Sequence, residues 1–227
     1  MIEPRQHAYL HAMGIPIWTE QARTDTTAQS EPENPATNEI ANLDWTALAD
    51  QVKSCQACPL STTRKQTVFG SGHPQAELMI IGEAPGAEED RQGQPFVGRA
   101  GQLLTNMLQA VGLQRDQVYI ANVLKCRPPG NRDPKPDEVA ACNAYLNRQI
   151  DIVQPRLIVS VGGISAKNLL QTEQPVGRLR GRVHQYAQTG TDIIVTYHPA
   201  YLLRRPEEKA KVWNDLQQIA AHLKQQP

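Results

Sequence analysis

The four cysteines of this chain fall into two groups that could hold a metal or a cluster. Cys55 and Cys58 form a C-x-x-C pair, and Cys126 and Cys142 lie far along the chain. Four thiolates from two such segments can converge on one centre, and zinc and a [4Fe–4S] cluster both accept this ligand set. Buried free thiols are the alternative, whereas disulfides are unexpected in a chain long enough to form its own core. The spacing predicts ligation without choosing between zinc and iron–sulfur.

A Gly- and Pro-rich segment at residues 82–101 could approach a flat ligand closely. It reads GEAPGAEED at 82–90 and QPFVGRAG at 94–101, and such turns can point backbone N–H groups at a ligand. It matches neither of the common phosphate-binding glycine patterns, and an ordinary tight turn with a solvated acidic run is the alternative. Phe96, one of only two phenylalanines, lies in this segment. Its place favours a stacking platform over core packing.

Two further segments carry polar side chains after apolar runs. Asn122 can offer an amide donor and an amide acceptor to the edge of a pyrimidine base, although a lone Asn is often a turn residue. His198 opens the segment HPAYLLRR, which mixes apolar side chains with two arginines. Such a mixture is typical of a loop that enters a DNA groove, although the histidine alone could be structural.

The elements that must position these residues follow from hydrophobic periodicity. Short apolar runs at 78–81, 118–120, 157–161 and 193–196 alternate with segments of helical period, such as 103–111 and 139–150. This alternation predicts an α/β fold with an open parallel sheet covered by helices. Ligands bind such sheets beyond the carboxyl ends of the strands, where the candidate residues stand.

Length and charge limit the function further. The chain has 227 residues, 23 acidic and 23 basic side chains and a net charge of zero, so we expect one catalytic domain whose DNA contacts are local. No apolar run is long enough to span a bilayer, and no signal peptide is recognisable. A cytoplasmic protein is expected.

The N-terminal part differs from the rest. Residues 1–20 include the apolar stretch YLHAMGIPIW, residues 21–42 are a polar, flexible linker, and residues 43–227 form the globular domain. The first segment is interpreted as a docking peptide that folds on a partner; a helix that packs back on the domain is the alternative.

From residue 43 onward the chain resembles the iron–sulfur uracil-DNA glycosylases called family 4. The resemblance rests on GEAPGAEED, QPFVGRAGQLL, ANVLKCRPPGNRDPKPDE, Cys142 and HPAYLLR, which occur in the family's order. It implies a three-layer αβα fold with a four-stranded, mainly parallel sheet. It also implies a hydrolase that cleaves the N-glycosidic bond of flipped-out deoxyuridine in DNA during base excision repair and leaves an abasic site.

The resemblance implies a role for each candidate residue. A structural [4Fe–4S] cluster would be held by Cys55, Cys58, Cys126 and Cys142. In the uracil pocket, Phe96 would stack on the base, Asn122 would read its polar edge and the backbone at Ala84 would hold a carbonyl. His198 would contact uracil O2, where negative charge accumulates, and Glu83 and Glu89 are candidates for orienting water or stabilising the cationic sugar. The DNA-binding residues would be Pro199, Ala200, Leu202, Leu203 and Arg204, with Leu202 or Leu203 inserted where the base had been.

Residues 1–20 lie outside the resemblance to family 4. Their G-I-x-x-W pattern is faintly similar to the N-terminus of the psi subunit of DNA polymerase III, which predicts the replicative clamp loader as a partner. The chain also lacks the His-containing basic insertion of related glycosylases that trap DNA covalently, so turnover is expected. The expected state is a monomer.

Three other readings stay open at this point. The chain could be a non-catalytic iron–sulfur DNA-binding module tied to the replication machinery, although retention of the pocket residues argues against it. It could act on another deaminated base, such as hypoxanthine or xanthine. It could also be a four-cysteine zinc protein, which would be colourless.

Overall fold

A computed structural model describes residues 39–225 of the chain. The expected docking peptide at 1–20 and most of the expected linker at 21–42 lie outside the described residues, so both stay predictions. Ile40, at the start of the described part, is buried in a cluster with Leu48 and Val52. The packed body therefore includes residues just before 43.

The centre of the fold is a six-stranded sheet in the order β1-β3-β2-β4-β6-β5. Its four middle strands are parallel to one another and confirm the four expected strands. The outer two are antiparallel and too short to be seen as sequence patterns. The strands are β1 (Ser71–Gly72), β2 (Leu78–Gly82), β3 (Tyr119–Asn122), β4 (Leu157–Val161), β5 (Val183–Gln185) and β6 (Asp192–Thr196).

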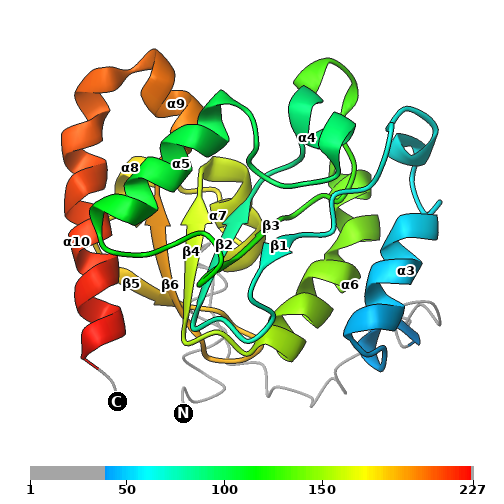
Figure 1. Ribbon diagram of the computed structural model, residues 1–227, viewed down its shortest axis with the longest axis horizontal. Coiled ribbons are helices and arrows are strands. Elements are labelled where there is room, and N and C mark those ends of the chain that lie inside the picture. The colour runs from blue at the N-terminus through cyan, green and yellow to red at the C-terminus, as the bar shows by residue number, and fades with distance from the viewer. Residues whose placement is uncertain (1–38, 226–227) are drawn as a thin grey trace, which may run out of the picture. The chain divides into compact units, whose positions relative to one another are not determined.

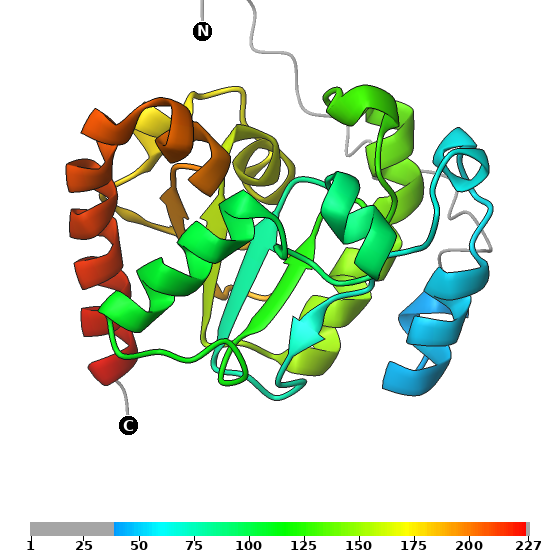
Figure 2. The ribbon, with the colours of Figure 1, turned by 45° about the horizontal axis from the view of Figure 1, so that its top comes forward.

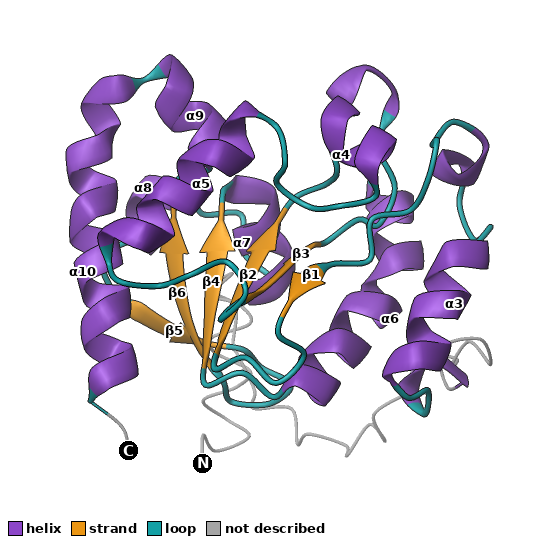
Figure 3. Cartoon of the chain, viewed as in Figure 1, coloured by secondary structure: helices purple, strands orange, loops and turns teal. Residues whose placement is uncertain are grey.

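Helices surround the sheet (Figures 1 and 3). Among the described residues, no helix has the length and apolar character that crossing a membrane requires. The α-helices are α3 (Trp45–Ser54), α4 (Ala87–Gln92), α5 (Arg99–Ala110), α6 (Pro136–Val153), α7 (Gly163–Leu170), α8 (Val176–Leu179), α9 (Pro199–Arg204) and α10 (Lys209–Lys224), and the 3₁₀ turns are η1 (Pro59–Thr62), η2 (Pro129–Asn131) and η3 (Pro206–Glu208).

The middle strands are buried on both faces, because successive side chains point to opposite sides of a strand. Ile81 faces a cluster with side chains of α6, α7 and α8, and its neighbour Ile80 faces a second cluster with side chains of α5, α9 and α10. Figure 2 shows α5 crossing one face of the sheet. This arrangement confirms the expected three-layer αβα fold.

A buried ion pair fixes the end of β6 that leads into the site. Asp215 on α10 is 1% exposed and pairs with Arg180 at 2.6 Å. Its carboxylate also accepts a 2.7 Å hydrogen bond from Thr196 Oγ1 at the last position of β6. Two residues later comes His198, so this contact of α10 with β6 helps to set where the histidine stands.

Removing Asp215 should destabilise the protein strongly. Asp215→Ala leaves the Thr196 hydroxyl without its acceptor and the largely buried Arg180 guanidinium without its carboxylate, which should cost about 3–5 kcal/mol. Glu173→Ala is the control, because it breaks the exposed pair with Lys167 and should cost at most about 1 kcal/mol. Chemical denaturation followed by circular dichroism measures both. Equal losses for the two variants would contradict the role given to Asp215.

Candidate active site

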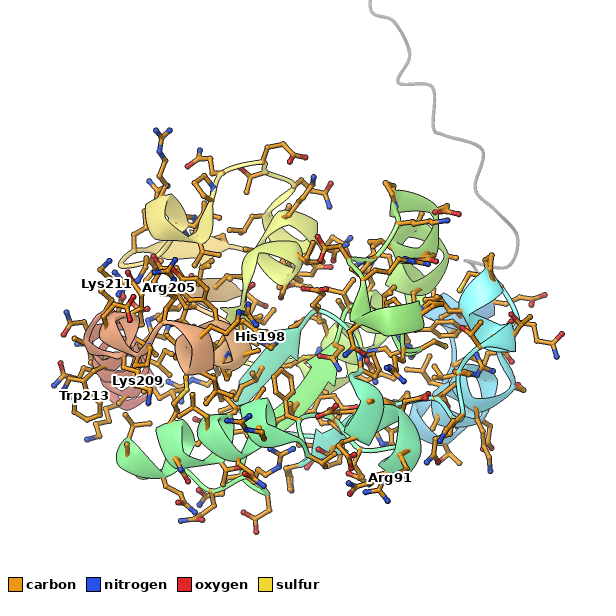
Figure 4. All side chains as sticks on the ribbon, turned by 90° about the horizontal axis from the view of Figure 1, so that it is seen from above. Arg91, His198, Arg205, Lys209, Lys211 and Trp213 are labelled. Atoms are coloured by element: carbon orange, nitrogen blue, oxygen red, sulfur yellow. The ribbon has the colours of Figure 1, made fainter. Side chains whose placement is uncertain are left out.

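A cavity of about 510 Å³ opens at the carboxyl ends of β2, β3 and β6. In Figure 4, His198 lies near the middle of the face that is seen from above, beside the ends of the strands. The cavity therefore lies where the parallel sheet predicted a ligand site. Among the expected site residues, the lining includes Glu83, Ala84, Glu89, Phe96, Asn122, His198, Ala200 and Arg204.

Phe96 forms one wall of the cavity in an unusual backbone conformation. Its φ is +52°, a value that bulky residues rarely adopt. Its ring is almost buried and lies 5.7 Å from the His198 ring, centroid to centroid. A Cβ at Gly82 would lie 2.6 Å from the ring, and one at Gly101 would overlap the Phe96 carbonyl group. Two glycines thus make room for Phe96 to face both the core and the cavity.

Asn122 ends β3 with an unpaired acceptor. The residue is 2% exposed, and its Oδ1 has no hydrogen-bond partner among the described residues. Leaving such an acceptor unpaired costs about 1–3 kcal/mol. Because Asn122 lines the cavity, a ligand that donates a hydrogen bond from a flat edge could remove this cost.

His198 presents a neutral ring with a defined tautomer. Its Nδ1 accepts a 3.1 Å hydrogen bond from the backbone N–H of Ala200. Burial and, to a smaller extent, the charge of Arg204 lower the pKa of His198 to about 4, against the opposing charge of Glu89. At neutral pH the ring is therefore uncharged, and its single proton is on Nε2. Nε2 is then a hydrogen-bond donor.

The two candidate glutamates differ in their surroundings. Glu89 Oε1 accepts hydrogen bonds from the backbone N–H groups of Val97 and Gly98, at 3.0 and 2.9 Å, so it holds the loop that carries Phe96. The Glu83 carboxylate is bonded by no side chain of the described residues. Burial and, to a smaller extent, the charge of Asp133 raise the pKa of Glu83 to about 7. Glu83 is thus the glutamate available to exchange a proton near neutral pH.

The two leucines of α9 differ in their exposure to solvent. Leu202 is 1% exposed and packs in the core with side chains of α5 and α10, whereas Leu203 is 39% exposed. Pro199 is also buried. Leu202 would have to leave the core to enter DNA, whereas Leu203 already lies at the surface.

Sequence reasoning missed several residues of this site. The sequence marks Gly82 only as the first residue of a Gly- and Pro-rich segment, whereas in the structure it leaves the space in which Asn122 and Phe96 meet. Asp133 comes from the loop after η2 and influences Glu83. That loop is held by Arg132, which pairs with the buried Glu138 at 2.6 Å. The contacts of Gly82 with Asn122 and of Asp133 with Glu83 join segments distant in sequence, so no local pattern signals them.

The four cysteines gather around one hydrophobic cluster on α3, η1, α6 and the segment after β3. Cys126 and Cys142 are buried, while Cys55 and Cys58 are partly exposed. Burial raises the pKa of the Cys126 thiol, Arg64 opposes the shift through its hydrogen bond and charge, and charge on Cys58 and Cys55 would add to the shift.

Donor groups also point at two of these sulfurs. Arg64 Nη1 lies 3.1 Å from Cys126 Sγ, and the backbone N–H of Lys125 lies 3.3 Å from Cys142 Sγ. No group of three or more His, Cys, Asp or Glu among residues 39–225 is arranged to hold a metal ion. The N–H donors of Arg64 and Lys125 suit cysteines in the thiolate form, because thiolates accept such hydrogen bonds.

Comparison with known proteins agrees with the site. Residues 69–217 match the family model described as the uracil DNA glycosylase superfamily. The type-4 uracil-DNA glycosylase of Sulfurisphaera tokodaii is 45% identical over 76% of this chain and 81% of its own. The type-4 enzymes of Archaeoglobus fulgidus and Thermotoga maritima are 44% and 40% identical, over 74% and 79% of this chain and 88% and 94% of their own. The chain belongs to the uracil DNA glycosylase superfamily.

Proposed function

We propose that this protein is a uracil-DNA glycosylase that hydrolyses the N-glycosidic bond of flipped-out deoxyuridine and leaves an abasic site. The observation that carries the proposal is the buried, unpaired Oδ1 of Asn122 in a cavity that also holds the Phe96 ring and the His198 imidazole. The type-4 relatives, similar over most of this chain, support the same reaction.

The proposed reading of the base follows from these three side chains. Uracil has an N3–H donor between two carbonyl acceptors, and the unpaired Oδ1 of Asn122 would accept from N3–H while the amide NH₂ donates to O4. Cytosine has an acceptor at N3 and a donor at C4, so it would oppose both contacts. Phe96 would stack on the ring, which orients it without reading its edge.

Bond cleavage places positive charge on the sugar and negative charge on the departing base. His198 Nε2–H would donate to uracil O2 as that charge develops, and a neutral donor suits this role because its proton stays in place. Glu83, when ionised, would stabilise the cationic sugar and orient the attacking water. Glu89 would act indirectly, through the loop that carries Phe96.

On the DNA side, the exposed Leu203 would fill the space left by the flipped base, with Arg204 near the phosphates. Both belong to α9, which begins directly after His198. The same short helix would therefore couple base extrusion to the placement of the catalytic histidine.

We also propose a [4Fe–4S] cluster on Cys55, Cys58, Cys126 and Cys142. The proposal is supported by the position of all four cysteines at one hydrophobic cluster and by the N–H donors that face two of their sulfurs. When bound, such a cluster would supply no step of hydrolysis and would tie α3, α6 and the segment after β3 together.

Replacing His198 should slow excision without unfolding the protein. His198→Ala removes the donor to the developing oxyanion and should lower kcat by about 10²–10³-fold. His73→Ala is a matched control, since His73 Nδ1 makes the same local contact with the N–H of Gln75 at an exposed place. The measurement is cleavage, after alkali, of an oligonucleotide with one uracil, beside a thymine control. Full activity of His198→Ala would refute the assigned role.

The pH dependence should report Glu83. Since the ionised carboxylate acts and its pKa is about 7, excision should rise with pH through about 7 and level off about one unit higher. His198 titrates near 4 and should add no limb above that range, while Asp133, Glu89, Arg99, Arg132 and Arg204 share the cavity with Glu83.

In Glu83→Gln the rate should fall and the rising limb should vanish. Glu77→Gln, an exposed change at the opposite ends of the strands, should keep it. A limb that survives in Glu83→Gln belongs to another group.

The cluster proposal predicts a brown protein with about four iron atoms per chain. Cys126→Ser should lose the broad visible absorption and most of the iron, and Ser54→Ala beside the C-x-x-C pair should keep both. Metal analysis with visible spectroscopy decides the matter, since stoichiometric zinc in a colourless protein would sink the assignment.

A further inference from the structure

The Lys125 side chain lies inside the protein, directly behind the base-reading Asn122. The residue is 1% exposed, and a buried ammonium is tolerated only when it has hydrogen-bond acceptors. Its Nζ donates to the backbone carbonyl of Asn122 at 2.8 Å and to Gln149 Oε1 at 2.6 Å. The lysine thus joins the end of β3 to α6, the helix that packs beside this strand (Figure 1).

Gln149 completes a closed network. It is fully buried, and its Nε2 donates to the Phe69 carbonyl at 2.9 Å and to Tyr119 Oη at 3.0 Å. Its amide orientation is therefore determined, because the opposite orientation would place NH₂ against the ammonium. Both N–H donors and the oxygen of the amide are engaged, so neither Lys125 nor Gln149 is free to shift.

This network holds Asn122 through its backbone carbonyl, which accepts the hydrogen bond from Lys125. The chain after β3 is also tied to β2 by hydrogen bonds from Val123 N to Gly82 O and from Leu124 N to Glu83 O, both 3.0 Å. The strand ends at Asn122, so beyond it only such contacts set the peptide. An Asn that must meet a base edge needs its backbone fixed to within a fraction of an ångström.

We propose that Lys125 and Gln149 are positioning residues that fix Asn122 for uracil recognition. The inference rests on the proposed glycosylase function and extends it to residues that do not touch the base. Apolar side chains of similar size could fill the same space with less desolvation. The network is thus explained by the geometry it imposes on Asn122.

The test compares Gln149→Leu, Lys125→Met and the double variant in excision of uracil from an oligonucleotide. Each single change should lower kcat about tenfold or more while the KM for DNA changes less than about twofold, because the DNA contacts lie elsewhere. Free uracil should inhibit both variants more weakly than wild type. Since the two residues act as one unit, the double variant should be no slower than the slower single.

Tyr186→Phe is the matched control. It removes a 2.9 Å hydrogen bond from Tyr186 Oη to Asn147 on the same helix α6, and it should leave kcat, KM and inhibition as in wild type. Thermal melting and visible absorption check the folding and the cysteine site of every variant. A merely structural network would lower the melting temperatures of Gln149→Leu and Lys125→Met and leave the inhibition by uracil unchanged.

Other outcomes overturn the inference. It fails if folded Gln149→Leu keeps the wild-type kcat, if KM moves instead of kcat, or if the two losses multiply in the double variant. Should Gln149→Leu or Lys125→Met not fold, Tyr119→Phe, which removes a single partner of Gln149, must still lower kcat, and an unchanged kcat there overturns it. Wild-type protein that excises no uracil overturns the proposed function as well, whereas active wild type with unaffected variants overturns this inference alone.

Discussion

The site depends on the register between β2 and β3, which sets Gly82 opposite Asn122 at the ends of the two strands. A side chain at Gly82 would occupy the space where the Asn122 amide and the Phe96 ring meet. The absence of one Cβ therefore lets a polar reading group and an aromatic wall from separate segments share one cavity. A shift of one residue in this register would turn Asn122 away from the cavity.

Burial favours the uncharged form of both ionisable groups, Glu83 and His198, in this cavity. A weakly polar environment disfavours charge, so it raises the pKa of Glu83 and lowers that of His198. The histidine remains a neutral donor, while the glutamate titrates close to neutral pH. The two shifts need no separate devices, because both groups face the same hollow at the end of the sheet.

The segment from Asn122 to Cys126 connects this cavity to the cysteine region. At one end it contributes the residue proposed to read the base, and at the other a thiol that faces Arg64. Between them, Leu124 packs among the cysteines and Lys125 is bonded to α6. Anything that holds the cysteines together therefore also limits the movement of the cavity wall.

The sequence alone determined the αβα layers, the four parallel strands and the segments that carry the site, because period-2 and period-3.6 patterns are local and the ends of parallel strands share one edge. Tertiary structure decided which leucine of α9 is exposed, the positive φ of Phe96, the free acceptor of Asn122 and the burial of Lys125. These properties depend on which distant segments come into contact. Leu202 and Leu203 are chemically identical, and only the packing of α9 against α5 and α10 distinguishes them.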